Sequence, residues 1–333
     1  MKKYKVYGIG AALVDTEIKV QDSELEQMKV EKGLMTLVDE ARQAELIAQL
    51  EGHIVKAKHA SGGSAGNSMI ATAHFGGPTF MSCKVANDSD GDIYVADLEA
   101  AGVDHCFGDS RSEGTTGKCL VMISPDAERS MNTFLGISET LSTEQLNPEA
   151  IADSEYVYLE GYLVTSPTGR AAAIKARELA EAAGVKTALS FSDPGMVEFF
   201  RDGIAEIIGT KVDLVFCNED EALGWAQSDD MDVAIEKLKE VCNSFVVTLG
   251  AKGALTFDGT TLTKVESQPV KAVDTNGAGD MFAGAFLYAI TSGEDFPTAG
   301  RFASLAAGKV VANYGPRLPA ADHAAIRAEF FGE

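Results

Sequence analysis

Short apolar runs alternate with longer amphipathic stretches through the second half of the chain. Apolar runs with at most one charged residue are typical of strands that are buried on both faces of a sheet. These runs lie at 156–161, 186–191, 213–218 and 244–250. Apolar residues recur with helical spacing between them, over 167–183, roughly 195–208 and 218–240. The alternation predicts βαβ units and therefore a mostly parallel sheet with helices on both faces.

The first half of the chain is less regular but contains the same two kinds of segment. Strands are expected over 4–10 and 79–85, and helices over 38–50, 63–75 and 90–101. Two polar, strand-like pieces, about 12–38 and 104–135, interrupt the pattern, and we expect them to form a small accessory sheet. No linker or internal repeat divides the 333 residues, so we expect a single domain over 1–333.

The composition is that of a folded globular protein, with 45% hydrophobic residues available for a core. The formal net charge of -22 repels phosphate backbones, which argues against nucleic-acid binding. A local cradle of backbone N–H groups can still bind a small anion inside an acidic protein. A small-molecule ligand is therefore the expected partner.

The cysteines and the N-terminus give no sign of an extracellular or membrane protein. The five cysteines are scattered and form no C-x-x-C pair, so we expect reduced thiols instead of a disulfide framework or a zinc site. No apolar run reaches the roughly 18 residues of a membrane span, and the N-terminal segment lacks the apolar run of a signal peptide. We therefore expect a cytoplasmic protein with no membrane partner.

The stretch AVDTNGAGDMFAGAF, residues 272–286, joins a glycine-rich turn to the start of a helix. An apolar stripe with helical spacing follows Gly279 and consists of Met281, Phe282, Ala285, Phe286, Ala289 and Ile290. Gly277, Ala278 and Gly279 therefore lie at a helix N-terminus, where unpaired N–H groups and the helix dipole attract anions.

Asp280 follows this turn, and an aspartate at this position can be explained in two ways. An acid in the first turn of a helix is favourable by itself. Beside a bound phosphate, however, it repels the ligand unless it faces an incoming hydroxyl and accepts its proton. We expect the helix end to depress the pKa of Asp280 and make it a weak base. Phosphoryl transfer tolerates a weak base, because its loose transition state requires little early proton removal.

Two further motifs follow apolar strands. In NEDEA, residues 218–222, Asn218 and Glu221 form the pattern of a helix capping box. The same two residues lie where α/β sheets bind ligands, and there they could hold metal-bound waters beside a phosphate chain. In VTLGAKGA, residues 247–254, a hairpin turn is the favoured local explanation and a ligand contact is the alternative.

Two glycine-rich stretches near the N-terminus are less specific. The glycines of ASGGSAGNS, residues 60–68, allow either close approach of a ligand or tight packing at a helix start. GIGAAL, residues 8–13, resembles a dinucleotide fingerprint, but Leu13 occupies the third glycine position. A dinucleotide-dependent oxidoreductase is therefore a weak alternative.

The motifs GGSAGN, NEDE, TLGAKGA and DTNGAGD, in this order and spacing, resemble those of the ribokinase-like (PfkB) carbohydrate kinases. DTNGAGD is the most specific of the four, and the resemblance covers nearly the whole chain. HASGGSAGNS, LEGYLVTSP and LSFSDP are most similar to the adenosine kinase branch. The resemblance implies a three-layer α/β fold with a small β-sheet lid formed by about 12–38 and 104–135. It also implies transfer of the γ-phosphoryl group of ATP, with Mg²⁺, to a hydroxymethyl group of a sugar or nucleoside.

The resemblance also implies roles for particular residues around the nucleotide. Asp280 matches the catalytic base, and Gly277 to Gly279 match the anion hole. Asn218 and Glu221 match the pair that organises Mg²⁺, through water, and the phosphates. The positions that match nucleotide contacts are Thr248, Gly250 and Gly253. By analogy with relatives, the backbone around Asp274 is a candidate potassium site.

At the acceptor end, Asp15 matches the acid that grips the acceptor hydroxyls, with Gly63 and Asn67 beside it. Arg129 matches a lid arginine that neutralises charge on the transferring group. The aromatic partner for a base is either Tyr162 or Phe134.

One departure leaves the acceptor open. Ala11-Ala12 precedes LVD where adenosine kinases carry Asn-Pro, and that asparagine contacts the ribose. A ribokinase- or fructokinase-like sugar kinase is therefore the alternative within the class, and a non-catalytic sensor of nucleotides or sugars is the alternative outside it. The sequence is compatible with a monomer or a homodimer.

Overall fold

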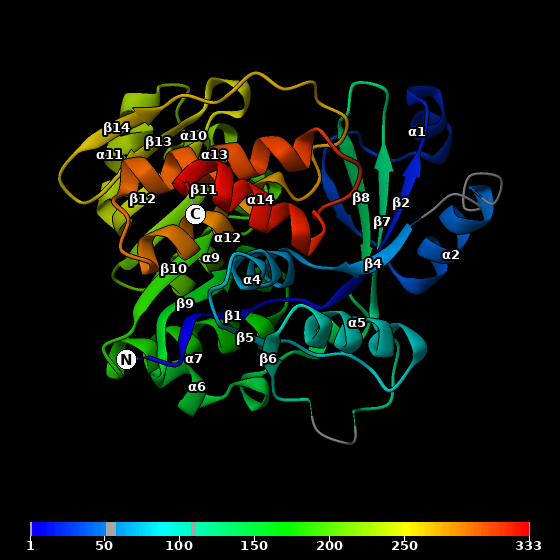
Figure 1. Cartoon of the computed structure of the whole chain (residues 1–333). Helices are drawn as coiled ribbons and strands as arrows, with labels where there is room; N and C mark the ends of the chain where they lie inside the picture. The colour runs from blue at the N-terminus through cyan, green and yellow to red at the C-terminus, as the bar shows by residue number, and fades with distance from the viewer. Residues whose placement is uncertain (1, 51–57, 108–110, 333) are drawn as a thin grey trace.

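Two sheets organise the protein, and the computed structural model describes residues 2–50, 58–107 and 111–332 of it (Figure 1). The large sheet has the strand order β14-β13-β12-β11-β10-β9-β1-β5-β6. Its strands are β1 (Tyr4–Ile9), β5 (Thr79–Ser82), β6 (Val103–His105), β9 (Ser154–Glu160), β10 (Lys186–Ser190), β11 (Val212–Asn218), β12 (Cys242–Thr248), β13 (Ala254–Phe257) and β14 (Leu262–Val265). The neighbours from β6 to β12 are parallel, whereas β13 and β14 continue the sheet antiparallel. The mostly parallel sheet that the alternating pattern predicts is confirmed.

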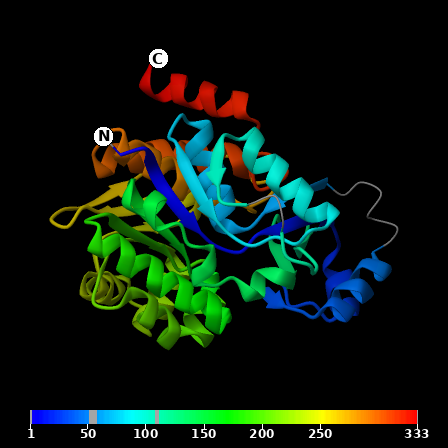
Figure 2. The same cartoon turned by 90° about the horizontal axis from the view of Figure 1, so that it is seen from below.

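Helices cover both faces of the large sheet, because successive strand residues point to opposite sides. One layer contains α6 (Pro148–Ala152), α7 (Pro167–Ala182), α8 (Pro194–Phe199), α9 (Arg201–Ile208), α10 (Glu219–Ala226) and α11 (Met231–Val241). The other contains α4 (Ser64–His74), α5 (Ser89–Ala100), α12 (Ala278–Thr291), α13 (Phe296–Val311) and α14 (Ala320–Phe331). Along β9, Val157 and Leu159 pack in the first layer, and Tyr156 and Tyr158 in the second. The three layers are visible in Figure 2.

Among the described residues, four short 3₁₀ helices connect these elements. They are η1 (Gly136–Thr140), η2 (Thr143–Gln145), η3 (Gly161–Thr165) and η4 (Gly250–Lys252). The stretches 195–208 and 218–240, each expected as one helix, are both split in two, into α8 with α9 and α10 with α11. η4 joins β12 to β13, which pair antiparallel, so the hairpin expected at 247–254 is confirmed.

The small sheet has the order β3-β8-β7-β2-β4 and stands beside the large one (Figure 1). Its strands are β2 (Leu13–Lys19), β3 (Met35–Leu37), β4 (Lys58–Gly62), β7 (Gly117–Ile123) and β8 (Arg129–Phe134). The helices α1 (Asp22–Met28) and α2 (Glu40–Gln49) cover one of its faces, where Leu25 and Leu46 pack against Ile18 and Leu120. This sheet covers the cavity described below.

The boundaries expected for the small sheet are wrong in two places. Strand β4 pairs antiparallel with β2, although KHASG carries no strand signal of its own. Residues 104 and 105 belong to β6, which pairs with β5 in the large sheet. Residues 108–110 of the expected piece 104–135 lie outside the described residues.

The remaining global features agree with the sequence. All five cysteines are free thiols, as expected, and Cys106 alone among them is exposed. No helix in the described part of the chain has both the length and the apolar character that crossing a bilayer requires.

Candidate active site

The N-terminus of α12 opens onto a cavity. Its N-cap, Gly277, has a left-handed backbone with φ 73°, and a Cβ there would lie 2.1 Å from the carbonyl oxygen of Pro316. Glycine is therefore required at this position on both counts. The amides of Gly277 and Gly279 have no hydrogen-bond partner within the described residues, and the space above Gly279 is open. The expected helix start is present, and its unpaired amides are of the kind that can bind an anion.

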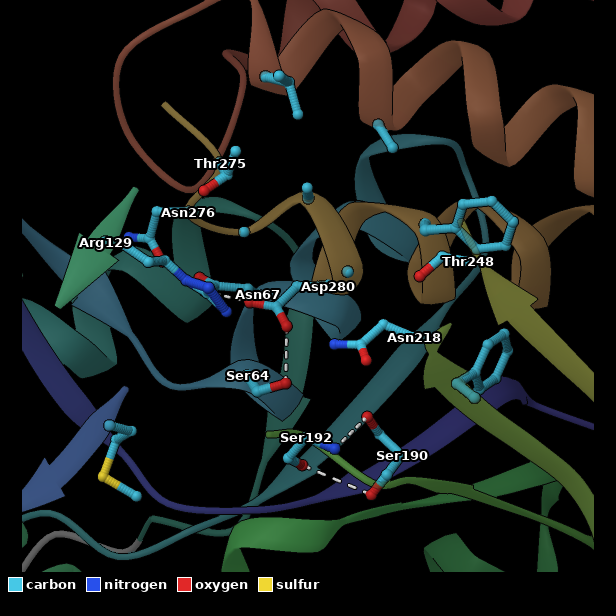
Figure 3. Close-up of a pocket in the computed structure, with 18 of the residues that line it drawn as sticks. Ser64, Asn67, Arg129, Ser190, Ser192, Asn218, Thr248, Thr275, Asn276 and Asp280 are labelled. Carbon is cyan, nitrogen blue, oxygen red and sulfur yellow. Dashed lines mark hydrogen bonds between the residues drawn. The ribbon is translucent and has the colours of Figure 1, made fainter. Parts of the chain in front are cut away.

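Asp280 is held in place by a second helix N-terminus. The Oγ atom of Ser64 donates to its Oδ1 at 2.7 Å, and Nδ2 of Asn67 donates to its Oδ2 at 2.9 Å (Figure 3). Both donors lie in the first turn or so of α4, which packs against α12. The carboxylate is therefore fixed at the point where the two helix starts meet.

The expected depression of the Asp280 pKa is wrong. Burial raises this pKa, against the opposing effects of the Ser64 and Asn67 hydrogen bonds and of the charges on Arg129 and Arg317. Loss of hydration outweighs these favourable effects because the carboxylate lies at the bottom of a cavity. Asp280 is thus a stronger base than its position at a helix start suggests.

A cavity of about 770 Å³ lies between the ends of the large-sheet strands and the small sheet. The predicted site residues that line it are Asp15, Gly63, Asn67, Arg129, Tyr162, Asn218, Glu221, Thr248, Gly250, Gly253, Gly277, Ala278, Gly279 and Asp280. These residues come from both sheets and from the starts of α4, α10 and α12. Segments that lie far apart in the sequence therefore form one site.

Phe134 and Asp274 do not line this cavity. Arg129, Met131 and Thr133 on β8 line it, and side chains alternate along a strand, so Phe134 points to the other face. Asp274 is fully buried, and its two carboxylate oxygens accept hydrogen bonds from the amides of Asn276 and Gly315, both at 2.9 Å. Phe134 is thus a wrong candidate for the base partner, and Asp274 has a structural role in the glycine-rich turn.

Asn218 and Glu221 form the expected capping box at the start of α10. The Asn218 Oδ1 atom accepts from the Glu221 amide at 2.8 Å, and Glu221 Oε2 accepts from the Asn218 amide at 3.0 Å. Burial raises the pKa of Glu221 to about 8. Both side chains also line the cavity, so capping and a ligand contact coexist. Within the described ranges, no cluster of three or more His, Cys, Asp or Glu side chains could hold a metal by itself.

Arg129 supplies a positive charge to the cavity from β8 (Figure 3). Its Nε atom is buried without a hydrogen-bond partner, and the guanidinium forms none of the ion pairs found among the described residues. Its charge acts on Asp280, Asp193 and Tyr162. A half-buried arginine whose Nε atom is buried and unpaired among the described residues is suited to an anionic ligand, because the ligand would satisfy its donors.

Asp15 lines the cavity from β2 of the small sheet. A Cβ added to Gly62 of β4 would lie 2.1 Å from Asp15 Oδ1, so glycine is required for this carboxylate to fit. Burial, followed by the charge of Glu17, raises the pKa of Asp15 to about 8. This carboxyl therefore gains from a ligand that donates hydrogen bonds to it.

Two functional residues were not predicted from the sequence, Ser64 and Glu160. Glu160 ends β9 and is buried; its Oε1 accepts from the Ala11 amide at 3.1 Å and its Oε2 from the Ala65 amide at 2.8 Å. It thus joins the residues just before β2, which carries Asp15, to the first turn of α4, which carries Asn67. The available signal was an acid at the end of an apolar strand, in LEG, because a charge is rare in a buried position unless it is paired.

Such a site places a carboxylate beside a helix end with unpaired amides and an arginine without an ion-pair partner among the described residues, a combination that is suited to phosphoryl transfer to a hydroxyl. Comparisons with known proteins agree. Residues 33–323 match the pfkB family of carbohydrate kinases. The chain therefore belongs to this family. The alternative of a dinucleotide-dependent oxidoreductase is wrong.

Several relatives are similar over almost their whole length. The adenosine kinase of Schizophyllum commune is 27% identical over 322 residues, covering 89% of this chain and 91% of its own. The structure of an adenosine kinase from Sinorhizobium meliloti superposes with a TM-score of 0.92 at 35% identity, covering 98% of this chain and 99% of its own. A probable sugar kinase from Rhizobium etli CFN 42 gives 0.93 at 33% identity, covering 99% and 100%. The protein is accordingly an ATP-dependent phosphotransferase that acts on a hydroxyl group of a nucleoside or sugar.

Proposed function

We propose that the acceptor is a nucleoside and that ATP phosphorylates its hydroxymethyl group. The observation that supports a nucleoside over a free sugar is the apolar lining that the small sheet provides to the cavity. This lining consists of Leu13, Met35, Leu37, Met131 and Leu135. A free sugar carries hydroxyls all round, and each needs a hydrogen-bond partner when buried. A nucleoside instead presents a flat base to an apolar surface and needs polar partners for its ribose.

Asp15 provides the polar partner that a ribose requires. An ionised carboxylate accepts hydrogen bonds from two neighbouring hydroxyls at once. Tyr162, on η3, also lines the cavity, and its hydroxyl donates to the Ser192 carbonyl oxygen at 3.3 Å, so the orientation of its ring is fixed. Tyr162 is therefore the proposed aromatic contact of the base. The adenosine kinase names among the relatives support this choice.

The proposed reaction moves one proton and one phosphoryl group. Asp280, oriented by Ser64 and Asn67, accepts the proton of the acceptor hydroxyl, whose oxygen forms the new bond to the γ-phosphorus of ATP. The bond from that phosphorus to the bridging oxygen breaks, and ADP leaves with the electron pair. The amides at Gly277 and Gly279 and the Arg129 guanidinium stabilise negative charge on the group in transit. The small sheet, as the proposed lid, excludes water, which would otherwise accept the phosphoryl group.

Magnesium is part of this proposal. Both carboxylate oxygens of Glu221 already accept hydrogen bonds from Asn218, so contact with the ion through water suits this pair better than direct ligation. When bound, Mg²⁺ would supply positive charge that stabilises the phosphates of the nucleotide. Potassium near Asp274 is a weaker proposal, because both oxygens of that carboxylate are occupied by backbone amides. A cytoplasmic location, supported by the use of ATP, and a monomer or homodimer complete the proposal.

An acceptor screen tests the proposal. Purified protein with Mg-ATP would be offered adenosine, other nucleosides, ribose and fructose, and ADP release would be measured. We expect the highest kcat/KM with a nucleoside. A sugar as the best acceptor would contradict the nucleoside assignment. Absence of turnover on the whole panel would favour the non-catalytic sensor.

A further inference from the structure

The segment from Gly315 to Leu318 lies behind the anion-binding turn. The amide of Gly315 donates to Asp274 Oδ2 at 2.9 Å, and the Pro316 carbonyl oxygen packs where a Cβ of Gly277 would be. Leu318 is buried in the core shared by α4 and α12. The backbone of this segment is therefore fixed by the same turn that carries Gly277 and Asp280.

Arg317, in the middle of this segment, extends from the turn to β4 and α5. Its Nη2 atom donates to the Ser61 carbonyl oxygen at 2.9 Å and to Asp97 Oδ2 at 2.6 Å, and 14% of the side chain is exposed. The Ser61 hydroxyl donates to the same Asp97 oxygen. One guanidinium thus connects the C-terminal segment to β4 through Ser61 and to α5 through Asp97.

β4 is the strand that contacts Asp15. It pairs antiparallel with β2, with Leu13 opposite Gly62 and Val14 opposite Ser61. Gly62, the residue after Ser61, packs directly against the Asp15 carboxylate. A shift of β4 at Ser61 would therefore move the surface on which Asp15 rests.

We propose that Arg317 is a positioning residue for the acceptor: it holds β4 against Asp15 and supplies positive charge near the Asp15 carboxyl. The proposal rests on the proposed function, since Asp15 is taken as the residue that binds the acceptor. It assigns Arg317 an effect on acceptor binding that is separate from nucleotide binding, because Arg129 and the α12 amides face the phosphates.

The charges around Asp15 indicate what loss of Arg317 would do. Glu17 on the same strand and Asp280 on α12 both raise the pKa of Asp15, and Arg317 lowers it. The remaining titratable neighbour, Cys119 on β7, is a buried thiol whose pKa is raised well above its ordinary value, so it stays neutral. Without Arg317, the pKa of Asp15 would rise further, and the ionised form that accepts two hydroxyl hydrogen bonds would be scarcer.

The test compares Arg317→Met, which removes the charge but keeps a long side chain, with Arg317→Lys, which keeps the charge. Steady-state kinetics with Mg-ATP and the best acceptor of the screen would be measured from pH 6 to pH 9.5. For Arg317→Met we expect the acceptor KM near pH 7.5 to rise about tenfold or more, because small displacements in a binding site have large effects. The ATP KM should change less than twofold. The pH at half-maximal kcat/KM for the acceptor should move upward, because Arg317 lowers the pKa of both Asp15 and Asp280. Arg317→Lys should restore the pH midpoint.

Asp97→Asn is a second, milder variant that removes the negative partner of Arg317 without removing the guanidinium. We expect a smaller rise in the acceptor KM and the same direction of effect. Equal changes in both KM values, or an unmoved pH midpoint in Arg317→Met, would overturn the proposal and leave a purely structural role.

Calorimetric binding of adenosine to the wild type and to Arg317→Met separates this proposal from the proposed function. If the wild type binds adenosine without turning it over, the proposed function fails, and weaker binding by Arg317→Met would still support the positioning role. If both proteins bind adenosine equally, the positioning role fails while the proposed function stands. A wild type that neither binds nor phosphorylates any acceptor would overturn both.

Discussion

Nδ2 of Asn67 donates to Oδ2 of Asp280 at 2.9 Å. The start of α4 thereby orients a carboxylate that belongs to the start of α12. The Oδ1 atom of Asn67 is buried and has no hydrogen-bond partner in the part of the chain that the structure describes, so this side chain has a further acceptor available for a ligand. The relationship explains why GGSAGN and DTNGAGD, more than 200 residues apart, act as one site.

Replacing Asn67 by Ala should therefore lower kcat by about 10- to 100-fold, the usual effect of losing one hydrogen bond to a charged group. The hydrogen bond lowers the pKa of Asp280, so its loss should also raise the pH at which kcat/KM reaches half its maximum. A pH–rate profile of Asn67→Ala against wild type measures both effects. A lower kcat with an unchanged midpoint would argue against orientation of the base by Asn67.

Arg129→Met should lower kcat by about 10²–10³-fold, because it removes a fixed donor from the group in transit. Arg129→Lys should recover part of this loss, since lysine keeps the charge but not the forked geometry. Single-turnover rates at saturating ATP and acceptor provide the measurement. If the Met and wild-type rates agreed within threefold, Arg129 would have no role in the chemical step.

Glu221→Gln distinguishes a phosphate-organising role from capping alone. Glutamine can keep the hydrogen bond from the Asn218 amide, loses the acceptor for Asn218 Nδ2, and removes the negative charge. We expect the Mg²⁺ concentration for half-maximal rate to increase about tenfold, with little change in thermal stability. The measurement is a Mg²⁺ titration of the initial rate at fixed ATP. An unchanged Mg²⁺ requirement would leave Glu221 with the capping role only.

We expect the contribution of Asp15 to the free energy of unfolding to fall as the pH rises. Its pKa is about 8 in the folded protein and near 3.8 when the group is free, so the folded state binds the additional proton between these values. The free energy of unfolding that this group contributes therefore falls from about pH 4 to about pH 8, and below that window ionisation imposes no cost.

Asp15→Asn removes that cost and should stabilise the protein more at pH 8.5 than at pH 5, by about 1–3 kcal/mol. Urea unfolding at the two pH values measures the difference, with the exposed Asp229→Asn as the matched control. A stability gain of equal size at both pH values would mean that Asp15 is not a buried carboxyl with a raised pKa.

The sequence predicts the large sheet well because its strands are apolar runs with a local signal. The polar strand β4 has no such signal, and its conformation comes from pairing with β2. The motifs predicted the residues around Asp280. Glu160 could not be predicted in this way, because its contacts with the amides of Ala11 and Ala65 form only in the folded chain. The Asp280 pKa was predicted with the wrong sign because the helix end is a local feature, whereas burial depends on the whole cavity. The prediction that Phe134 contacts the base was wrong, because the side of the sheet to which each β8 side chain points depends on strand register.

The central claim is that Asp280 is the base of a kinase. The most direct test is the kcat of Asp280→Asn, which keeps the size of the side chain and a partner for Ser64, measured with the best acceptor of the screen. The proposed role predicts a loss of at least about 10²-fold in kcat, the usual contribution of a positioned general base, with an unchanged ATP KM. A kcat within about tenfold of wild type would contradict it.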